Sequence, residues 1–281
     1  MMIARTISDV RRAVKAWRKE GLTIGLVPTM GYLHEGHASL VKAAKASCDR
    51  VVVSVFVNPT QFGPNEDLES YPRDFEHDCA LLEDLGTDLV FHPEPTELYF
   101  PDASTWVEVP SLAQNLCAKT RPTHFRGVCT VVSKLFHIAA PDKAFFGQKD
   151  AQQLAVIRRM VRDLNFDLEI VGCPIVREAD GLAKSSRNTY LNPKERQAAL
   201  VLNHSLKKAY SLIEAGETDT NKLLAVIKEC IAAEPLAKLD YAEAVDADSM
   251  KPLAAVTGNV LFAIAVYIGK TRLIDNFLVS R

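Results

Sequence analysis

Two histidines and two glycines lie close together in the segment Pro-Thr-Met-Gly-Tyr-Leu-His-Glu-Gly-His at residues 28–37. An apolar run predicted to be a strand, residues 23–27, precedes this segment, and apolar residues at helical spacing, residues 38–46, follow it. Gly31 and Gly36 permit the sharp turn that this change requires and leave room for a phosphate. The following helix would offer unpaired N–H groups and its positive dipole end to an anion, with His37 as a further donor. The segment therefore predicts a phosphate site.

Two histidines three residues apart are also compatible with a zinc site or with an ordinary polar loop. A zinc-protease helix carries both histidines on one continuous helical face, with a glutamate between them. Gly31 and Gly36 interrupt that face here, so the phosphate interpretation is preferred.

Uncharged amides follow a second apolar run, residues 51–57, in the segment Asn58-Pro59-Thr60-Gln61. Ligands of open α/β sheets bind outside the carboxyl ends of the strands, so Asn58 and Gln61 are expected to face the same crevice as the histidines. Each amide offers a donor and an acceptor, which suits hydroxyl and carboxylate groups. The alternative is a plain turn, which Asn-Pro also indicates.

Lys149 follows a third predicted strand, residues 143–146, in the segment Gly147-Gln148-Lys149-Asp150. A lysine at the start of a helix is disfavoured by the helix dipole unless an anion compensates, so Lys149 is a candidate phosphate ligand. Asp150 is a natural helix N-cap, and Gln153 lies one turn further on. A solvated surface lysine is the alternative.

Two further polar segments are candidates. Lys184-Ser185-Ser186-Arg187 combines hydroxyl groups with a fixed cation, which suits a polyphosphate, although serine-rich segments are usually ordinary loops. Asp78 lies in the acidic first turn of a predicted helix, residues 75–85, where favourable interaction with the helix dipole explains most of its character. A Mg²⁺ role for Asp78 is the minor alternative.

The composition is that of an ordinary soluble globular protein, with 281 residues, 48% hydrophobic and 24% charged. The net charge of −2 gives no general attraction to nucleic acid or to an anionic membrane. Six scattered cysteines without a CxxC pair argue against a disulfide framework and against a structural zinc site. No apolar run reaches membrane-spanning length. A cytoplasmic protein without nucleic-acid or membrane partners is expected.

Apolar β runs alternate with helical patterns over roughly the first 175 residues, which predicts a Rossmann-like, doubly wound parallel sheet. The expected strands are residues 23–27, 51–57, 88–92, 143–146 and 168–171, and the expected helices begin near 36, 75, 128 and 151. Beyond residue 175 the pattern changes to helices at 193–215 and 221–233 and strands at 240–245 and 260–267. We therefore expect a domain at residues 1–175 and a smaller C-terminal α+β domain at residues 176–281.

The motifs, taken in order, resemble those of the pantoate–β-alanine ligase (pantothenate synthetase) family. They are Pro-Thr-Met-Gly-x-Leu-His-x-Gly-His at 28–37, Asn-Pro-x-Gln-Phe at 58–62, Tyr-Pro-Arg at 71–73, His-Phe-Arg-Gly at 124–127, Gly-Gln-Lys-Asp at 147–150 and Ser-Ser-Arg-Asn at 185–188. The resemblance covers nearly the whole chain. The histidine motif alone is shared with the wider nucleotidyltransferase and class I aminoacyl-tRNA synthetase superfamily.

The resemblance implies that ATP activates (R)-pantoate as pantoyl adenylate, with Mg²⁺ accompanying the nucleotide, and that β-alanine then displaces AMP. It also implies a homodimer and a C-terminal domain that closes over the ATP site. At Lys184 the chain departs from the family, in which an apolar Met or Leu is more usual. The lysine adds a cation near the phosphates and leaves the motif intact.

The resemblance also implies roles for individual residues. His34 and His37 would contact phosphate, with His37 as the proton donor, and Lys149 would neutralise charge on the phosphoryl group. Gln61 and Gln153 would bind pantoate, Gln61 and Asn58 would border β-alanine, and Asp78 would contact Mg²⁺. The implied ATP-binding residues are Met30, Gly31, Tyr32, Leu33, His34, Glu35, Gly36, His37, Gly147, Gln148, Lys149, Asp150, Val176, Lys184, Ser185, Ser186 and Arg187.

Three other functions remain open on the residues alone. The first is a cytidylyl- or adenylyltransferase with the same histidine motif and a different acceptor. The second is an inactive, synthetase-like RNA-binding module, which the net negative charge argues against. The third is a metallohydrolase with zinc on His34 and His37.

Overall fold

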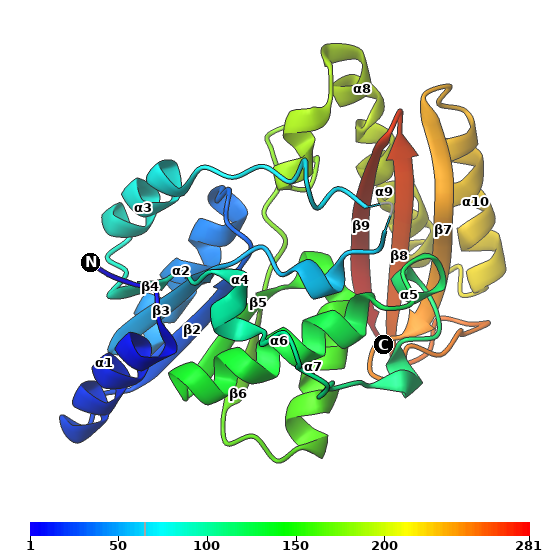
Figure 1. Cartoon of the computed structure of the whole chain (residues 1–281). Helices are drawn as coiled ribbons and strands as arrows, with labels where there is room; N and C mark the ends of the chain where they lie inside the picture. Colours follow the sequence, from blue (N-terminus) through cyan, green and yellow to red (C-terminus); the bar gives the residue numbers. More distant parts are fainter. Residues whose placement is uncertain (65) are drawn as a thin grey trace. The chain divides into compact units, whose positions relative to one another are not determined.

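The apolar runs of the first part of the chain form a six-stranded parallel sheet in the computed structural model (Figure 1). The structure describes residues 1–64 and 66–281. The strand order is β1-β4-β3-β2-β5-β6, and every neighbouring pair is parallel. The strands are β1 (Met2–Ala4), β2 (Ile24–Thr29), β3 (Arg50–Val55), β4 (Leu89–Phe91), β5 (Lys143–Gly147) and β6 (Glu169–Cys173). The predicted doubly wound parallel sheet is confirmed.

The described residues group into two compact units. Unit 1 consists of Met1–Val109, Thr123–Gln148 and Val156–Pro174, and unit 2 of Pro110–Pro122, Lys149–Ala155 and Ile175–Arg281. The units are groups of mutually contacting residues, so the division into domains at residues 175 and 176 stays a prediction.

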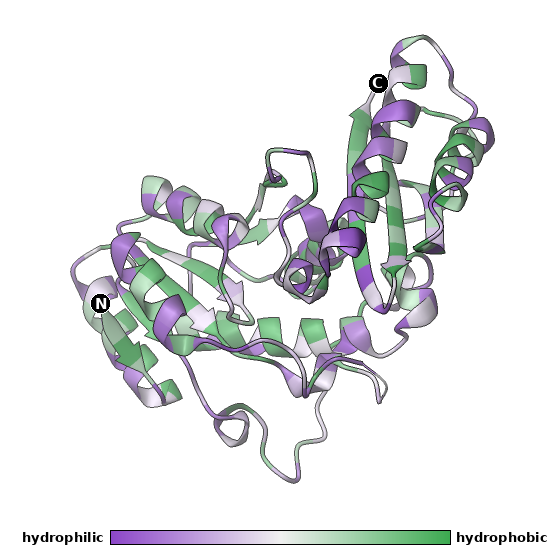
Figure 2. Cartoon of the chain, turned by 90° about the horizontal axis from the view of Figure 1, so that it is seen from above, coloured by the Kyte–Doolittle hydropathy of each residue, from purple (hydrophilic) through white to green (hydrophobic). Residues whose placement is uncertain are grey.

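The core of unit 1 follows from the alternation of side chains along each strand. Val27, Val53 and Phe145 point to one face of the sheet and belong to a buried cluster with residues of two helices, α2 (Glu35–Ser47) and α3 (Phe75–Asp84). The alternate strand residues point to the opposite face, where α6 (His124–Ala139) contacts β2 and also packs against α1 (Ile7–Lys19). Figure 2 shows hydrophobic residues along the strands and mixed residues along the helices. Unit 1 also contains α4 (Pro95–Leu98) and the 3-10 helix η1 (Pro59–Gln61).

Strand β2 lies between β3 and β5, so the direction of winding changes at this strand. Open parallel sheets bind ligands outside the carboxyl ends of the strands at such a change. The histidine segment follows β2, the amide segment follows β3, and Gly147 ends β5. The topology of unit 1 thus places three predicted motifs at one edge of the sheet.

Unit 2 is built on three antiparallel strands, β7 (Ala237–Asp246), β8 (Asn259–Ile268) and β9 (Thr271–Ser280). Apolar residues of these strands share a buried cluster with α9 (Leu200–Glu214) and α10 (Thr220–Ala232). The remaining short elements are η2 (Pro110–Leu112), α5 (Cys117–Thr120), η3 (Gln148–Asp150), η4 (Ser186–Tyr190) and α8 (Pro193–Ala198). The result is a small α+β unit, as predicted.

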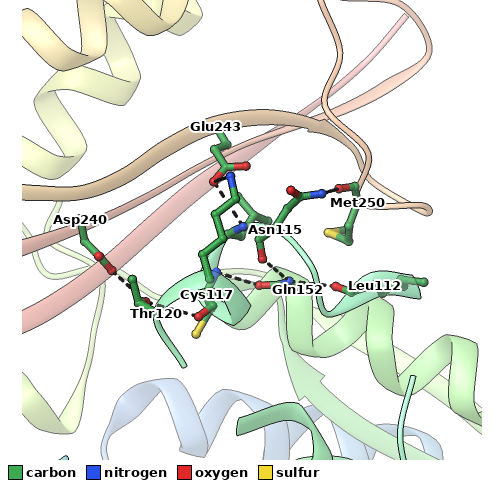
Figure 3. A network of polar contacts seen from close by, with 10 residues as sticks. Leu112, Asn115, Cys117, Thr120, Gln152, Asp240, Glu243 and Met250 are labelled. Carbon is green, nitrogen blue, oxygen red and sulfur yellow. Dashed lines mark hydrogen bonds and ion pairs between the residues drawn. The ribbon is translucent and has the colours of Figure 1, made fainter. Parts of the chain in front are cut away.

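Gln152 connects two separate segments of unit 2 (Figure 3). It lies at the start of α7 (Ala151–Asp163) and is buried. Its Nε2 donates to the carbonyl oxygens of Leu112 at 2.9 Å and Asn115 at 2.8 Å, and its Oε1 accepts from the N–H of Cys117 at 3.0 Å. One side chain therefore satisfies three backbone groups of the segment Pro110–Pro122.

The structure differs from the sequence-based expectations at a few elements. The helix expected at residues 193–215 is two helices, α8 and α9, which meet at Ala199. Helix α6 begins at His124, four residues before the expected start. Strands β1 and β9 and helix α1 are not among the expected elements. Strand β1 has only three residues, and β9 carries charged side chains.

Candidate active site

The segment after β2 turns sharply through two residues with left-handed backbones. Gly31 has φ 80° and Tyr32 has φ 51°. The last residue of β2, Thr29, stabilises the turn, because its Oγ1 accepts the N–H of Gly31 at 3.3 Å. This turn directs the chain from the end of β2 into the N-terminus of α2, as the spacing of the glycines predicts.

His34 and His37 cap helix α2 reciprocally. His34 is the N-cap residue, and its Nδ1 accepts the N–H of Gly36 at 3.1 Å. The Nδ1 of His37 accepts the N–H of His34 at 3.3 Å, and the two ring centroids are 4.1 Å apart. A nitrogen that accepts an N–H carries no proton, so each neutral ring carries its proton on Nε2. Both histidines are therefore set as Nε2–H donors beside a helix N-terminus.

Asp78 of α3 is buried beside the same turn, with an exposed fraction of 1%. Its Oδ2 accepts the N–H of Tyr32 at 2.9 Å and its Oδ1 accepts the N–H of Leu33 at 2.6 Å. Burial raises the pKa of Asp78, although the two backbone N–H groups act to lower it. Both carboxylate oxygens therefore bind the backbone of the turn, and the Mg²⁺ contact of Asp78 stays a prediction.

The two amides after β3 are buried and bonded to each other. The Nδ2 of Asn58 donates to Gln61 Oε1 at 3.0 Å and to the carbonyl oxygen of Gly127 at 3.2 Å. The Nε2 of Gln61 lies 3.1 Å from Met30 Sδ, so the histidine segment and the amide segment meet. Tyr99 donates its hydroxyl proton to Asn58 Oδ1 at 2.9 Å, and burial raises the pKa of this phenol. The amide of Gln61 is thus held in a fixed orientation.

Gly127 lets helix α6 approach η1 closely. A Cβ at this position would lie 2.5 Å from the carbonyl oxygen of Thr60 and 2.6 Å from both the Cα and the nitrogen of Gln61. One turn earlier, His124 Nδ1 lies 2.9 Å from the carbonyl oxygen of Gln61. Helix α6 therefore fixes the backbone that carries Gln61.

Lys149 lies in η3 and Gln153 in the first turn of α7, and both belong to unit 2. The carbonyl oxygen of Lys149 accepts from Asn276 Nδ2 of β9 at 2.8 Å. The Nζ of Lys149 lies 3.7 Å from Asp150 Oδ2, a loose ion pair. Gly147 and Gln148, the two preceding residues of the motif, belong to unit 1.

Val176 lies beside Lys184 in unit 2, because the N–H of Lys184 donates to the carbonyl oxygen of Val176 at 2.9 Å. The chain reverses between them at Gly181, which has φ 100°. The neighbouring Arg177 forms two hydrogen bonds, of 2.7 and 2.9 Å, with the carboxylate of Asp275, whose side chain is 1% exposed. This buried ion pair attaches the hairpin to β9.

The serine motif opens the 3-10 helix η4. Ser185 is its N-cap and accepts the N–H of Arg187 at 3.3 Å, while Ser186 is buried. Asn188 Nδ2 donates to Glu178 Oε1 at 3.1 Å, and Arg196 pairs with Glu178 Oε2 at 2.6 Å. Burial acts to raise the pKa of Glu178, but the hydrogen bonds from Arg196 and Asn188 hold it below its usual value.

Each unit therefore gathers its own part of the predicted site. Unit 1 brings the segment Met30–His37 together with Asn58, Gln61 and Asp78. Unit 2 brings Val176 beside the segment that contains Lys184, Ser185, Ser186 and Arg187, and it contains Lys149, Asp150 and Gln153.

Sequence reasoning did not identify the supporting residues Tyr99, Gln152 and Asn276. Their partners lie 35 to 127 residues away along the chain, so no local spacing reveals them. Gln152 alone has a local signal, because it is adjacent to the predicted site residue Gln153 at the start of the same helix.

Comparisons with known proteins agree over nearly the whole chain. A family model described as pantoate-beta-alanine ligase matches residues 2–278. A pantothenate synthetase of Clostridium acetobutylicum is 58% identical over 277 residues, which cover 99% of both chains. One of Enterococcus faecalis is 57% identical over 277 residues, covering 99% of this chain and 98% of the relative.

Solved structures give the same assignment. A pantothenate synthetase from Thermus thermophilus matches with a TM-score of 0.93 and 43% identity, covering 99% of both chains. A pantoate-beta-alanine ligase from Francisella tularensis, complexed with beta-gamma ATP and beta-alanine, matches with a TM-score of 0.79 and 36% identity, covering 99% of this chain and 97% of the other. On the strength of the family match and these relatives, this chain belongs to the pantoate-beta-alanine ligase family.

Proposed function

We propose that this ligase joins (R)-pantoate to β-alanine at the expense of ATP, through a pantoyl-adenylate intermediate, and so makes pantothenate, a precursor of coenzyme A. The observation that carries the proposal is the contact between Met30 Sδ and Gln61 Nε2 at 3.1 Å. This contact joins the histidine segment to the buried amides. A nucleotidyltransferase for another acceptor needs the histidine segment but not these amides. The Francisella tularensis relative, complexed with beta-gamma ATP and beta-alanine, supports the choice of substrates.

The reaction has two steps. A carboxylate oxygen of pantoate attacks the α-phosphorus of ATP, and pyrophosphate leaves with the electron pair of the broken P–O bond. The amine of β-alanine then attacks the acyl carbon, loses a proton, and AMP leaves. Adenylyl transfer depends on in-line positioning and on neutralisation of phosphate charge more than on covalent help from the protein.

In unit 1, the Nε2–H groups of His34 and His37 donate to phosphate oxygens, and His37 acts as the proton donor. The N-terminus of α2 adds its backbone N–H groups and its dipole. Gln61 binds pantoate and borders β-alanine, and Asn58 also borders β-alanine. The fixed orientation of the Gln61 amide, with Oε1 bonded to Asn58, supports this role.

In unit 2, Lys149 neutralises charge on the transferring phosphoryl group and Gln153 binds pantoate. Ser185, Ser186 and Arg187 bind the triphosphate, and Lys184 adds a further cation near it. The hydrogen bond from Asn276 Nδ2 to the carbonyl oxygen of Lys149 supports a fixed position for the backbone of this lysine. Closure of the C-terminal domain over the nucleotide would protect the adenylate from water.

Mg²⁺ accompanies ATP in this proposal and is carried by the nucleotide phosphates. Mg²⁺ prefers oxygen ligands and is often bound through substrate phosphates with few protein groups. Within residues 1–64 and 66–281, no cluster of three or more His, Cys, Asp and Glu side chains could hold a metal ion. Each oxygen of Asp78 accepts one backbone N–H and keeps a second lone pair, so a contact between Asp78 and Mg²⁺ stays a proposal.

The protein is further proposed to act in the cytoplasm as a homodimer on small molecules only, without nucleic-acid or membrane partners. In the described part of the chain, no helix combines the length and the apolar character needed to cross a membrane. Light scattering of the purified protein measures the oligomeric state directly.

Exchange of labelled pyrophosphate into ATP tests the first step. We expect exchange with (R)-pantoate and none with amino acids or other nucleotides, followed by formation of AMP and pantothenate when β-alanine is added. A folded protein that shows no pantoate-dependent exchange would refute the proposal. Exchange that depends on a different acid would favour another adenylyltransferase, and stoichiometric bound zinc would favour a metallohydrolase.

A further inference from the structure

The turn before α2 creates a small anion-binding concavity in the backbone. Gly31 and Tyr32 are successive left-handed residues, and the N–H groups of Tyr32 and Leu33 point to the same place. Such concavities of successive N–H groups bind anions, often phosphates. Here the carboxylate of Asp78 occupies the concavity, with one oxygen on each N–H at 2.9 and 2.6 Å.

The left-handed conformation of Tyr32 is costly without support. A left-handed backbone is unfavourable for a residue with a side chain, because Cβ lies too close to the following carbonyl oxygen. Charge-assisted hydrogen bonds from two successive N–H groups offset this cost and require the turn to stay in one shape. Gly31 completes the fit, because a Cβ there would lie 3.0 Å from Asp78 Oδ2 and 3.0 Å from Val55 Cγ1.

Helix α3, which carries Asp78, is itself fixed to the sheet. Its first residue, Phe75, stacks on the ring of His92, with the ring centroids 4.0 Å apart. His92 Nδ1 lies 2.6 Å from the carbonyl oxygen of Val55 at the end of β3. Helix α3 is thus held at the edge of the sheet, and the carboxylate of Asp78 in turn holds the turn that leads into His34.

Asp78 lies at a place where a charge is unfavourable. Burial is the largest influence on its pKa and raises it, although its two N–H partners lower it. A buried carboxylate with this environment contributes little to folding compared with a neutral side chain of the same shape. Its geometry instead serves the histidine turn.

We propose that Asp78 is a positioning residue for adenylate formation, which holds the turn Gly31–Leu33 so that His34 and His37 cap α2 and present their Nε2–H groups to the phosphates. This inference rests on the proposed function. It replaces a Mg²⁺-binding role for Asp78 with a role that acts through the backbone of the turn.

The test variant is Asp78→Asn, which keeps the size of the side chain and turns one acceptor into a donor that faces an N–H. The matched control is Asp74→Ala, which removes the N-cap bond to His77 N on the same helix without touching the turn. The kcat of pantoate-dependent exchange is expected to fall about 10-fold or more in Asp78→Asn, as for loss of one hydrogen bond to a charged group. The control is expected to stay within about twofold of the unmodified protein, because its loss is confined to helix capping.

Three further readouts separate positioning from a general structural role. The KM for pantoate is expected to be unchanged, because Asp78 bonds to the N–H groups of Tyr32 and Leu33, whereas the amide of Gln61 is held by Asn58. The Mg²⁺ concentration for half-maximal rate is also expected to be unchanged. Hydrogen exchange of the Tyr32 and Leu33 amides is expected to be slow in the unmodified protein and faster in Asp78→Asn, while the amides of β2 are expected to stay protected in both.

Recovery of kcat at high Mg²⁺ would overturn the proposal in favour of a metal role. So would a kcat within twofold of the unmodified protein, or equal losses in Asp74→Ala. Should Asp78→Asn not fold, rapid exchange of the Tyr32 and Leu33 amides in the unmodified protein would still refute the inference. Absence of pantoate-dependent exchange in the unmodified protein would refute the proposed function alone, since the amide exchange tests the turn independently.

Discussion

The close approach of α6 to η1 makes Gly127→Ala an informative substitution. A Cβ at residue 127 would lie 2.5 Å from the carbonyl oxygen of Thr60 and 2.6 Å from the backbone of Gln61. Ordinary van der Waals contact begins at about 3.4 Å, so the two backbones must separate by about 0.9 Å. Both colliding groups are backbone atoms, which cannot rotate away as a flexible side chain can.

The effect on activity is expected to exceed the effect on stability. Overpacking costs about 1–3 kcal/mol, and alanine gains about 1 kcal/mol over glycine within a helix, so the net loss of stability is about 2 kcal/mol at most. A displacement of about 1 Å in a positioning group can reduce the rate by about 100-fold. We therefore expect kcat/KM for pantoate to fall about 10- to 100-fold, because Gln61 moves with η1.

Steady-state kinetics with pantoate varied, together with urea unfolding, checks this expectation. Cys129→Ala is a matched control, because residue 129 is buried on the same helix and lies about 200° around the helix axis from residue 127. It should lower stability by about 1 kcal/mol and leave the KM for pantoate unchanged. A Gly127→Ala protein with unmodified kinetics would show that the position of η1 does not control the binding of pantoate.

Other expectations concern both units. His37→Ala and Lys149→Ala should each slow pantoate-dependent pyrophosphate exchange by about 100-fold with an unchanged circular dichroism spectrum, and normal rates in both would mean that the phosphates bind elsewhere. Arg177→Ala should lower the free energy of unfolding by about 3 kcal/mol in urea titrations, because its carboxylate partner on β9 is 1% exposed and would be left uncompensated, and a loss below 1 kcal/mol would contradict this. Glu178 has a lowered pKa in the folded protein, so its pairing with Arg196 stabilises the fold above the usual pKa of a glutamate and this stabilisation is lost as the pH falls through the folded-state value. The stability difference between the unmodified protein and Arg196→Ala should thus shrink in unfolding measurements below about pH 4, and a constant difference would refute the assignment.

Local patterns predict the central part of the fold well. Strand β3 is a short apolar run between turn signals, and such runs indicate fully buried strands in parallel sheets. Strand β9 is different, because the buried Asp275 interrupts its apolar pattern and forms an ion pair with Arg177, 98 residues earlier. Helices α8 and α9 meet at Ala199 without a glycine or proline to indicate the break. These features depend on partners that are distant in the sequence.

The candidate site also combines features that local patterns predict with features that depend on distant residues. The spacing of His34 and His37 predicts a phosphate-binding turn because both residues lie in one helical turn. Asp78 is 45 residues from Leu33, and its contact with the turn follows from the packing of α3 beside α2. The sequence pattern therefore predicts which groups would bind the phosphates, and the tertiary structure shows which residues hold those groups in place.

Unit 2 is assembled from three separate segments of the chain, and this has a consequence for recombination between relatives. Asn115 Nδ2 donates to the carbonyl oxygen of Met250, Lys119 pairs with Glu243, and Gln152 holds the same segment at three backbone groups. A chimera that exchanges only residues 176–281 would bring together parts from two parents that have not been selected to fit each other. Crossovers that also carry Pro110–Pro122 and Lys149–Ala155 keep each set of partners from one parent, so three separate stretches of the gene are inherited as a single module.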